Sequence, residues 1–293
     1  MLTDSTPSGY VNYLTSNFIG CWVIGVVFAL KDYVHSDLFV GVSVGFCGSL
    51  TTFSSWQLGI VETLVGVPGA PTSPGGKTYV WFQDQTIGFA VAFVGLTFGK
   101  HVGEYLLEKI PIRHFEELQT GHDKEKSQRT QWRVSAFSVS SATCAWLGMI
   151  LGACLVPGTN TFSLIFAPFG AWLRFLLSRY LNTLTIGFYW GTFVANVLGS
   201  VIEGILFGIL ITFSLDSLQC ESIWAVKYGF CGGLTTISTF VNELHTLPEM
   251  ISAYKHGISS VLVTQALLIV IVGSVVWTKQ DPFGEPSLCF YSN

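Results

Sequence analysis

The sequence predicts an all-α membrane protein made of two inverted copies of one helical unit. Half of its 293 residues are hydrophobic and only 11% are charged, against roughly 25% charged residues in an average soluble domain. The string GFCGSLTTFSSW at 45–56 returns as GFCGGLTTISTF at 229–240, each time inside a long apolar stretch. A repeat at this distance exceeds solenoid periods of about 20–50 residues, so it indicates two fused copies of a whole domain.

Apolar stretches of about 20 residues, the length at which a helix crosses a bilayer, occur repeatedly along the chain. They are 10–30, 38–64, 80–106, 134–155, 162–182, 189–211, 222–247 and 257–278. Each is expected to be a helix, because a lone span in hydrocarbon must satisfy its own backbone hydrogen bonds. No alternation of apolar and polar residues competes with this interpretation, so a β-barrel is excluded.

The spans and the charged residues between them divide the chain into four parts. Residues 1–106 form repeat 1, and 156–293 form repeat 2. Between them we expect a charged cytoplasmic linker at 107–133 and a linking transmembrane helix at 134–155. The linker carries much of the charge of the chain and is therefore expected to be solvated.

The orientation of the two copies follows from the charges. When the spans are threaded alternately across the bilayer, most Lys and Arg residues fall on one side, and only Lys77, Lys227 and Lys279 fall on the other. The positive-inside rule makes the first side cytoplasmic. The repeated string lies in the second and seventh spans, an odd separation, so its two copies cross in opposite directions. Inverted repeats place ion sites near the bilayer midplane.

A polar amide recurs inside an apolar helix before each copy of the string. Asn17 in repeat 1 corresponds to Asn196 in repeat 2, with the same spacing to the glycines that follow. Repeat 2 begins with a further span at 162–182 that holds Arg174, whereas repeat 1 begins with a short polar head. The first helix of repeat 1 is therefore expected to be missing from this sequence.

These features resemble the Fluc/FEX fluoride channels, specifically the eukaryotic type in which two domains are fused through a linking helix. The resemblance rests on the doubled GFCGxLTT string, the two Asn-bearing helices, the GAxxR sequence that ends at Arg174 and the inverted order. It implies two inverted four-helix Fluc-type units that act as a monomer, a fused pseudo-dimer, in the lipid bilayer. It also implies a passive channel that exports cytoplasmic fluoride across the plasma membrane.

The glycines and threonines of the string weaken a helix and can free backbone carbonyl oxygens for a hard cation. The resemblance implies a central structural sodium ion (Na+). Its expected ligands are the backbone carbonyls of Gly48, Thr51, Gly232 and Thr235. The alternative is that the glycines form a closely packed helix interface, and the two interpretations are compatible.

A small anion that must be released needs hydrogen-bond donors and aromatic edges without a trapping charge. The resemblance implies an anion pore lined by Phe53 and Phe240. The side chains expected beside them are Asn17, Ser54, Asn196, Ser238, Thr239 and Glu243. The crossed positions hold Trp56 and Ile237 instead of two phenylalanines, so one conducting and one degenerate pore are expected. The alternative for these aromatic residues is ordinary core packing.

Several ionisable residues and cysteines lie in or near the predicted spans. Arg174 matches the family's arginine and is expected in a vestibule, where it attracts anions or anchors its helix, with snorkelling to the headgroups as the alternative. Glu203 is an acid inside a span, which makes it a candidate functional residue by default. The alternative is that it neutralises Arg174 or Lys227. The histidines fall near span ends or in loops and are expected to be solvated. A disulfide between Cys220 and Cys289 is left open.

Other classes of function lack their motifs in this sequence. The net charge of −4 provides no basic field for nucleic acid, and nucleotide-binding and hydrolase motifs are missing, so an enzyme is not expected. An ion-coupled transporter of the small-multidrug type needs an embedded carboxylate in both halves, and only Glu203 was found. A non-conducting membrane scaffold is the second alternative.

Overall fold

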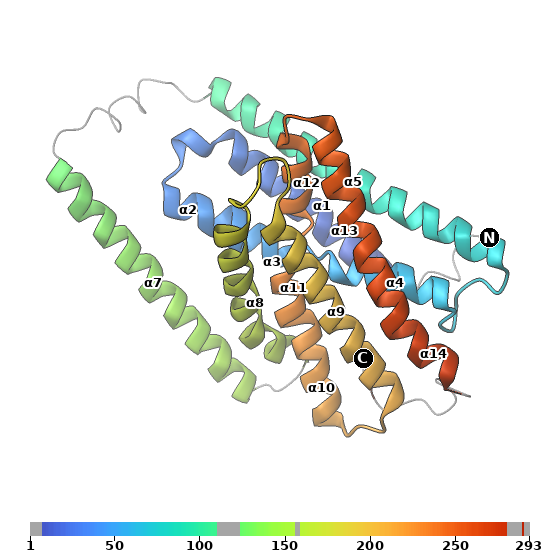
Figure 1. The fold of residues 1–293 in the computed structure, drawn as a ribbon. Coiled ribbons are helices and arrows are strands. Elements are labelled where there is room, and N and C mark those ends of the chain that lie inside the picture. The colour runs from blue at the N-terminus through green and yellow to red at the C-terminus, as the bar shows by residue number, and fades with distance from the viewer. Residues whose placement is uncertain (1–7, 110–123, 156–158, 280–288, 290–293) are drawn as a thin grey trace.

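The structure is a computed structural model that describes residues 8–109, 124–155, 159–279 and Cys289. Every regular element in these ranges is helical (Figure 1), as predicted. By length and composition, four helical stretches are suited to cross a membrane: Ser36–Val65, Pro74–Lys109, Trp190–Thr212 and Met250–Thr278. The protein is thus an all-α membrane protein.

The helices of the first half follow the predicted spans apart from terminal residues. They are α1 (Ser8–Ala29), η1 (Lys31–Tyr33), α2 (Ser36–Val40), η2 (Gly41–Cys47), α3 (Gly48–Leu50), α4 (Ser54–Val65) and α5 (Pro74–Lys109). The predicted span at 38–64 is therefore interrupted between α3 and α4, at the Thr-rich part of the repeated string.

The second half shows the same succession. Its elements are α7 (Lys124–Leu155), α8 (Thr159–Leu181), α9 (Trp190–Thr212), α10 (Ser217–Ala225), η3 (Val226–Cys231), α11 (Gly232–Leu234), α12 (Ser238–Thr246), α13 (Met250–Leu268), η4 (Ile269–Gly273) and α14 (Ser274–Thr278). The predicted linking helix is longer than expected, because α7 begins at Lys124. Residues 110–123 of the predicted linker lie outside the described residues.

The two repeated strings, at 45–56 and 229–240, fold alike although they lie far apart along the chain. In each, a π-helical segment (η2 or η3) leads into one turn of α-helix, and the residue that follows this turn is extended. The extended residues are Thr51, with φ −97° and ψ 141°, and Thr235, with φ −86° and ψ 155°. A π-helical segment adds a residue to a turn and is frequent at functional sites, and the hydropathy of the sequence did not indicate it.

Glycines let the first and last spans of the first half approach each other closely. Gly95, Gly99 and Gly103 recur every four residues along the face of α5 that meets α1. A Cβ atom on Gly99 would overlap the carbonyl oxygen of Trp22, and one on Gly25 would overlap that of Leu96. This is the small-residue packing expected where two helices cross in lipid.

The elements pack in a reciprocal way around the two broken helices. In Figure 1, α3 and α11 lie near the middle of the bundle, while α7 lies at its edge along α8. Helix α1 contacts α12 of the other half, and α9 correspondingly contacts α4. Likewise α5 contacts α12 and α13 contacts α4. Pairs that are exchanged in this manner are typical of a two-fold relation.

One covalent bond ties the end of the chain to the second half. Cys220, at the start of α10, forms a disulfide with Cys289, with 5.2 Å between their Cα atoms. Both residues are buried. The bond that the sequence left open is therefore present.

The close packing of α1 on α5 gives a first prediction. Gly99→Ala should lower the free energy of unfolding by about 1–3 kcal/mol, because the added methyl group meets backbone that cannot move aside cheaply. Gly148→Ala on α7 is the matched control, since nothing lies within 4 Å of its Cβ position. Thermal unfolding of the detergent-solubilised protein measures both, and equal melting temperatures would contradict the packing argument.

Candidate ion-conducting site

The two broken helices meet through hydroxyl groups that they exchange. The Thr51 Oγ1 atom lies 3.0 Å from Ser238 Oγ, and Ser54 Oγ lies 3.0 Å from Thr235 Oγ1. All four side chains are fully buried. Because Thr51 corresponds to Thr235 and Ser54 to Ser238 in the repeat, each contact is the symmetry equivalent of the other.

These hydroxyls also cap the helices that follow the breaks. The first residues of α4 and α12 have no side-chain cap from their own N-cap residues, Phe53 and Ile237. Instead the Ser54 N–H donates to Thr235 Oγ1 at 3.3 Å, and the Ser238 N–H donates to Thr51 Oγ1 at 3.2 Å. Each half thus satisfies orphan donors of the other, which the bilayer interior demands.

The two asparagines bind backbone groups at the helix breaks. The Thr52 N–H, which an unbroken helix would direct at the Gly48 carbonyl, donates to Asn17 Oδ1 at 2.8 Å, and Asn17 Nδ2 donates to the Thr52 carbonyl at 3.2 Å. Asn196 binds Thr236 in the same two ways, at 2.8 and 3.1 Å. Each asparagine side chain therefore binds both the N–H and the C=O of one threonine, in place of the hydrogen bonds that an unbroken helix would provide.

This arrangement bears on the expected sodium site. Because the asparagines take the N–H groups of Thr52 and Thr236, the carbonyls of Gly48 and Gly232 lose their usual helical donors. Neutral backbone oxygens at two meeting breaks are the donor chemistry that a hard monovalent cation accepts. The donor chemistry of these backbone carbonyls therefore fits a sodium ion.

Arg174 lies next to the same backbone. Its Nε donates to the Gly233 carbonyl at 3.0 Å, and its guanidinium fills the space that a side chain at Gly48 would need. The side chain is 1% exposed, so it does not snorkel to the headgroups. Among the described residues, Nη1 and Nη2 have no hydrogen-bond partner. Arg174 thus joins α8 to both breaks and adds a positive charge beside them.

The aromatic residues predicted for two pores form one cluster. The ring of Phe53 lies 5.5 Å from that of Phe240 and 5.7 Å from that of Trp56, in edge-to-face contacts. Ile237 belongs to the same buried cluster. Phe89 of α5, which the sequence analysis did not select, lies 5.1 Å from Trp56 and 6.3 Å from Phe240. In an edge-to-face contact the partly positive edge of one ring meets the partly negative face of its neighbour.

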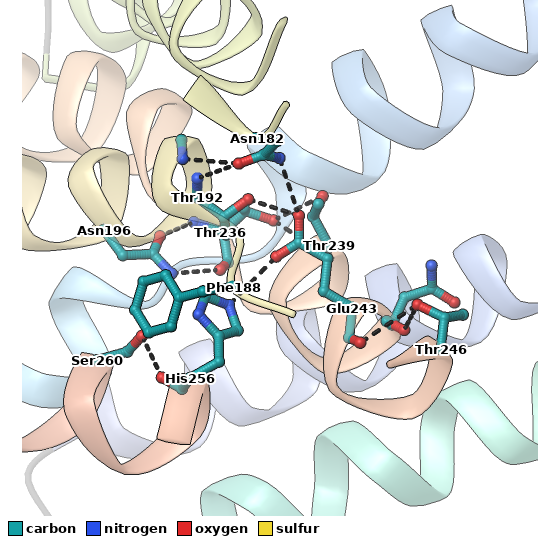
Figure 2. A network of polar contacts seen from close by, with 12 residues as sticks. Asn182, Phe188, Thr192, Asn196, Thr236, Thr239, Glu243, Thr246, His256 and Ser260 are labelled. Atoms are coloured by element: carbon teal, nitrogen blue, oxygen red, sulfur yellow. Dashed lines mark hydrogen bonds and ion pairs between the residues drawn. The ribbon is translucent and has the colours of Figure 1, made fainter. Parts of the chain in front are cut away.

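Glu243 is surrounded by polar partners from other elements (Figure 2). Thr192 Oγ1 on α9 donates to Glu243 Oε1 at 2.6 Å, and Asn182 Nδ2 donates to the same atom at 3.4 Å. The Nε2 atom of His256 on α13 faces Glu243 Oε2 at 3.5 Å. The His256 ring in turn packs against Phe240, with 5.3 Å between ring centroids.

His256 corrects the expectation that the histidines are solvated, because its side chain is completely buried. It lies on the inward face of α13, on the same side as Ser260 and Thr264, which are also buried. This four-residue spacing was the signal available in the sequence. Thr192 and Asn182 had no comparable signal, since they reach Glu243 from the start of α9 and the end of α8.

Glu203 and Lys227 are placed together. Lys227 Nζ lies 3.7 Å from Glu203 Oε1, and Glu203 is fully buried. Of the two partners considered for Glu203, the structure thus selects Lys227. Lys227 is itself buried, with 7% of its surface exposed. Thr239, the remaining predicted residue, donates its N–H to Thr236 Oγ1 at 3.3 Å.

Broken helices that meet through buried neutral donors are typical of membrane proteins that bind or pass ions. The chain belongs to the family described as CrcB-like protein, Camphor Resistance (CrcB), whose family profile matches residues 1–96 and 161–275. No solved structure was found to match it significantly.

Curated relatives carry names that refer to fluoride. Fluoride export protein 1 of Candida albicans is 30% identical over 313 residues, covering 94% of this chain and 75% of the relative. Fluoride export protein 1 of Neurospora crassa is 34% identical over 279 residues, 88% of this chain and 51% of the relative. The fluoride-specific ion channel FluC of Dechloromonas aromatica is 38% identical over 108 residues, 36% of this chain and 78% of the relative. The chain thus spans about half the length of the Neurospora relative.

The asparagine clamps give a second prediction. Asn196→Ala should lower the free energy of unfolding by roughly 1–3 kcal/mol for each backbone group of Thr236 left unsatisfied. Ser274→Ala, which removes an exposed hydroxyl on α14, is the control and should change little. Denaturant titration of the protein in detergent measures the difference. If Asn196→Ala were as stable as the control, the clamp would not support the break.

Proposed function

We propose that this protein is a passive, fluoride-selective channel that lets cytoplasmic fluoride leave the cell across the plasma membrane. Family membership and the names of the relatives support fluoride as the ion. The observation that carries the proposal is the set of buried uncharged donors where the two broken helices meet. A small anion can be stabilised by such donors and still be released, because the hydroxyl and amide donors carry no net charge of their own.

The architecture behind the proposal is a pair of inverted repeats, residues 1–106 and 156–293, joined by a cytoplasmic linker at 107–133 and the linking helix at 134–155. The exchanged hydroxyl contacts and the exchanged helix contacts support this relation. The protein acts as a monomer in the lipid bilayer, because both halves of the site come from one chain.

One conducting path runs past Phe53 and Phe240, with Asn17, Ser54 and Ser238 at the break. Asn196, Thr239 and Glu243 complete it, and Arg174 draws anions toward it. A second, degenerate path is bordered by Trp56 and Ile237. The membrane potential supplies the driving force, about 2.3 kcal/mol per charge per 100 mV for an anion leaving a negative interior.

His256 belongs to the conducting path through Glu243. A bare carboxylate beside Phe240 would repel an approaching anion. Thr192 and Asn182 donate hydrogen bonds to that carboxyl group, and the His256 imidazole lies 3.5 Å from it. Glu243 can then remain in the wall of an anion path.

A structural sodium ion would be held by the carbonyls of Gly48, Thr51, Gly232 and Thr235. When bound, it supplies a positive charge that fixes the two breaks against each other. The asparagine clamps support the assignment, because they turn the amide donors of Thr52 and Thr236 away from Gly48 and Gly232.

The third prediction tests the path. Purified protein in liposomes loaded with fluoride should release it rapidly, without a pH gradient and with exclusion of chloride. Phe240→Ile should slow release about tenfold or more, which corresponds to a barrier raised by about 1.4 kcal/mol. Trp56→Ile, also a buried aromatic residue of this cluster, is the matched control and should retain release. A fluoride electrode measures both rates.

The outcomes of this assay also separate the alternatives. Equal losses in the two variants would contradict a single conducting path. Release that depends on a pH gradient would favour an ion-coupled transporter, and no release from well-folded protein would favour a non-conducting scaffold.

The fourth prediction concerns His256. His256→Leu should slow fluoride release and lower the melting temperature, because it leaves a buried carboxylate without its partner at 3.5 Å. The double variant His256→Leu/Glu243→Gln should recover much of the stability, since the uncompensated charge is gone. If the single variant were as stable as the double one, the two side chains would not be coupled.

A further inference from the structure

A second pair of buried charges, Glu203 and Lys227, has no role in the proposed conducting path. Glu203 on α9 and Lys227 on η3 are 3.7 Å apart, Nζ to Oε1, and both are buried. Lys227 Nζ also lies 4.5 Å from the ring centroid of Trp224 and 5.6 Å from that of Tyr228. Both contacts are close enough for cation–π attraction. The ammonium is thus held by the carboxylate and by aromatic faces.

The carboxylate reaches across to the broken helix of the first half. Ser55 Oγ donates to Glu203 Oε1 at 2.9 Å. Ser55 is adjacent to Trp56, and its hydroxyl also accepts from Thr52 Oγ1 at 3.2 Å. The hydroxyl that could donate to a passing anion is therefore already donating to a fixed anion of the protein.

The internal repeat shows what stands at the equivalent place in the other half. Ser55 corresponds to Thr239, Glu203 to Ile24 and Lys227 to Ser43. Ile24 is buried and apolar, and the Ser43 hydroxyl donates to the Phe39 carbonyl of its own helix at 2.6 Å. Thr239, the repeat equivalent of Ser55, thus has no carboxylate at the position equivalent to Glu203, because Ile24 stands there. One half carries a charged pair where the other has neutral side chains.

The hydroxyl groups that follow the two breaks form two rows, Thr52 with Ser55 in the first half and Thr236 with Thr239 in the second. The charged side chains beside these two rows also differ. Glu62 on α4 lies close enough to Lys227 and Glu203 to interact with both electrostatically. The carboxyl groups of Glu62 and Glu203 therefore both lie near the ammonium of Lys227, on the side of Ser55, whereas the carboxyl group of Glu243 faces His256 near the ring of Phe240. An anion that approaches Ser55 meets the carboxylate of Glu203, which already accepts from the Ser55 hydroxyl, in a medium that screens poorly.

We propose that Glu203, held in place by Lys227, is a tethered anion that occludes the hydroxyl row of the first half next to Trp56. Its carboxylate occupies the donor of Ser55 as a permeating fluoride ion would, and it cannot leave. This inference rests on the proposed function, and it assigns the closure of the degenerate path to this ion pair in addition to the replaced aromatic residues.

The first experiment opens the occluded row. Phe240→Ile serves as the background in which the conducting path is slowed. Glu203→Ile/Lys227→Ser, which installs the residues found at the equivalent positions of repeat 1, should raise fluoride release from that background about tenfold or more, corresponding to about 1.4 kcal/mol. Release that stays at the background rate, from protein that elutes and melts like the background, would overturn the inference.

The second experiment transplants the pair. Ile24→Glu/Ser43→Lys in the otherwise unchanged protein should place the same occlusion beside Thr239 and abolish release. Ile24→Leu/Ser43→Ala changes the same positions without charge and should leave release unchanged. If the charged and the neutral variants conduct equally, the pair does not occlude.

Two further measurements keep the result interpretable. Where the double variant does not fold, Glu203→Gln in the Phe240→Ile background keeps the shape of the side chain and should still raise release, and failure to do so counts against the inference. The unchanged protein is measured in the same liposomes. If it passes no fluoride, the proposed function fails; if it conducts and the opened variants do not, only the occlusion fails.

Discussion

The whole arrangement depends on the exchange of hydroxyl hydrogen bonds between two broken helices. A helix that breaks inside a bilayer leaves N–H and C=O groups that water cannot reach, and each unsatisfied group is costly. Here Thr51 caps the helix that begins at Ser238, and Thr235 caps the helix that begins at Ser54. Each break therefore relies on a hydroxyl of the other half, and this exchange joins the two halves at this point.

Glycines, which have no side chain, allow the close approach of neighbouring helices and side chains at this site. Gly99 admits the backbone of α1, and Gly48 leaves the space that the Arg174 guanidinium fills. The asparagines then use this proximity to hold backbone groups of the breaks at 2.8 to 3.2 Å. Packing and polar satisfaction therefore support each other, and the site is held by buried contacts on every side.

The broken helices of the two halves keep the same backbone plan but have different charged residues beside them. In one region Glu203 and Lys227 pair across helices, and in the other Glu243 is surrounded by Thr192, Asn182 and His256. Buried charges are costly unless paired, so each carboxylate has its own partners. A duplicated chain can thus retain its scaffold while the electrostatics of its two regions diverge, which bears directly on anion passage.

The sequence by itself determined the helical spans, the position of each break and the correspondence of Asn17 to Asn196 in the repeat. Apolar length, weak helix formers and an internal repeat can all be read along the chain. The tertiary structure alone decided that Lys227 and His256 are buried, that Phe89 joins Phe53 and Phe240, and that Thr192 reaches Glu243. Hydropathy records what a residue is, whereas burial depends on which face of its helix the neighbouring helices cover. That face is set by contacts between segments far apart in sequence, so single spans do not contain it.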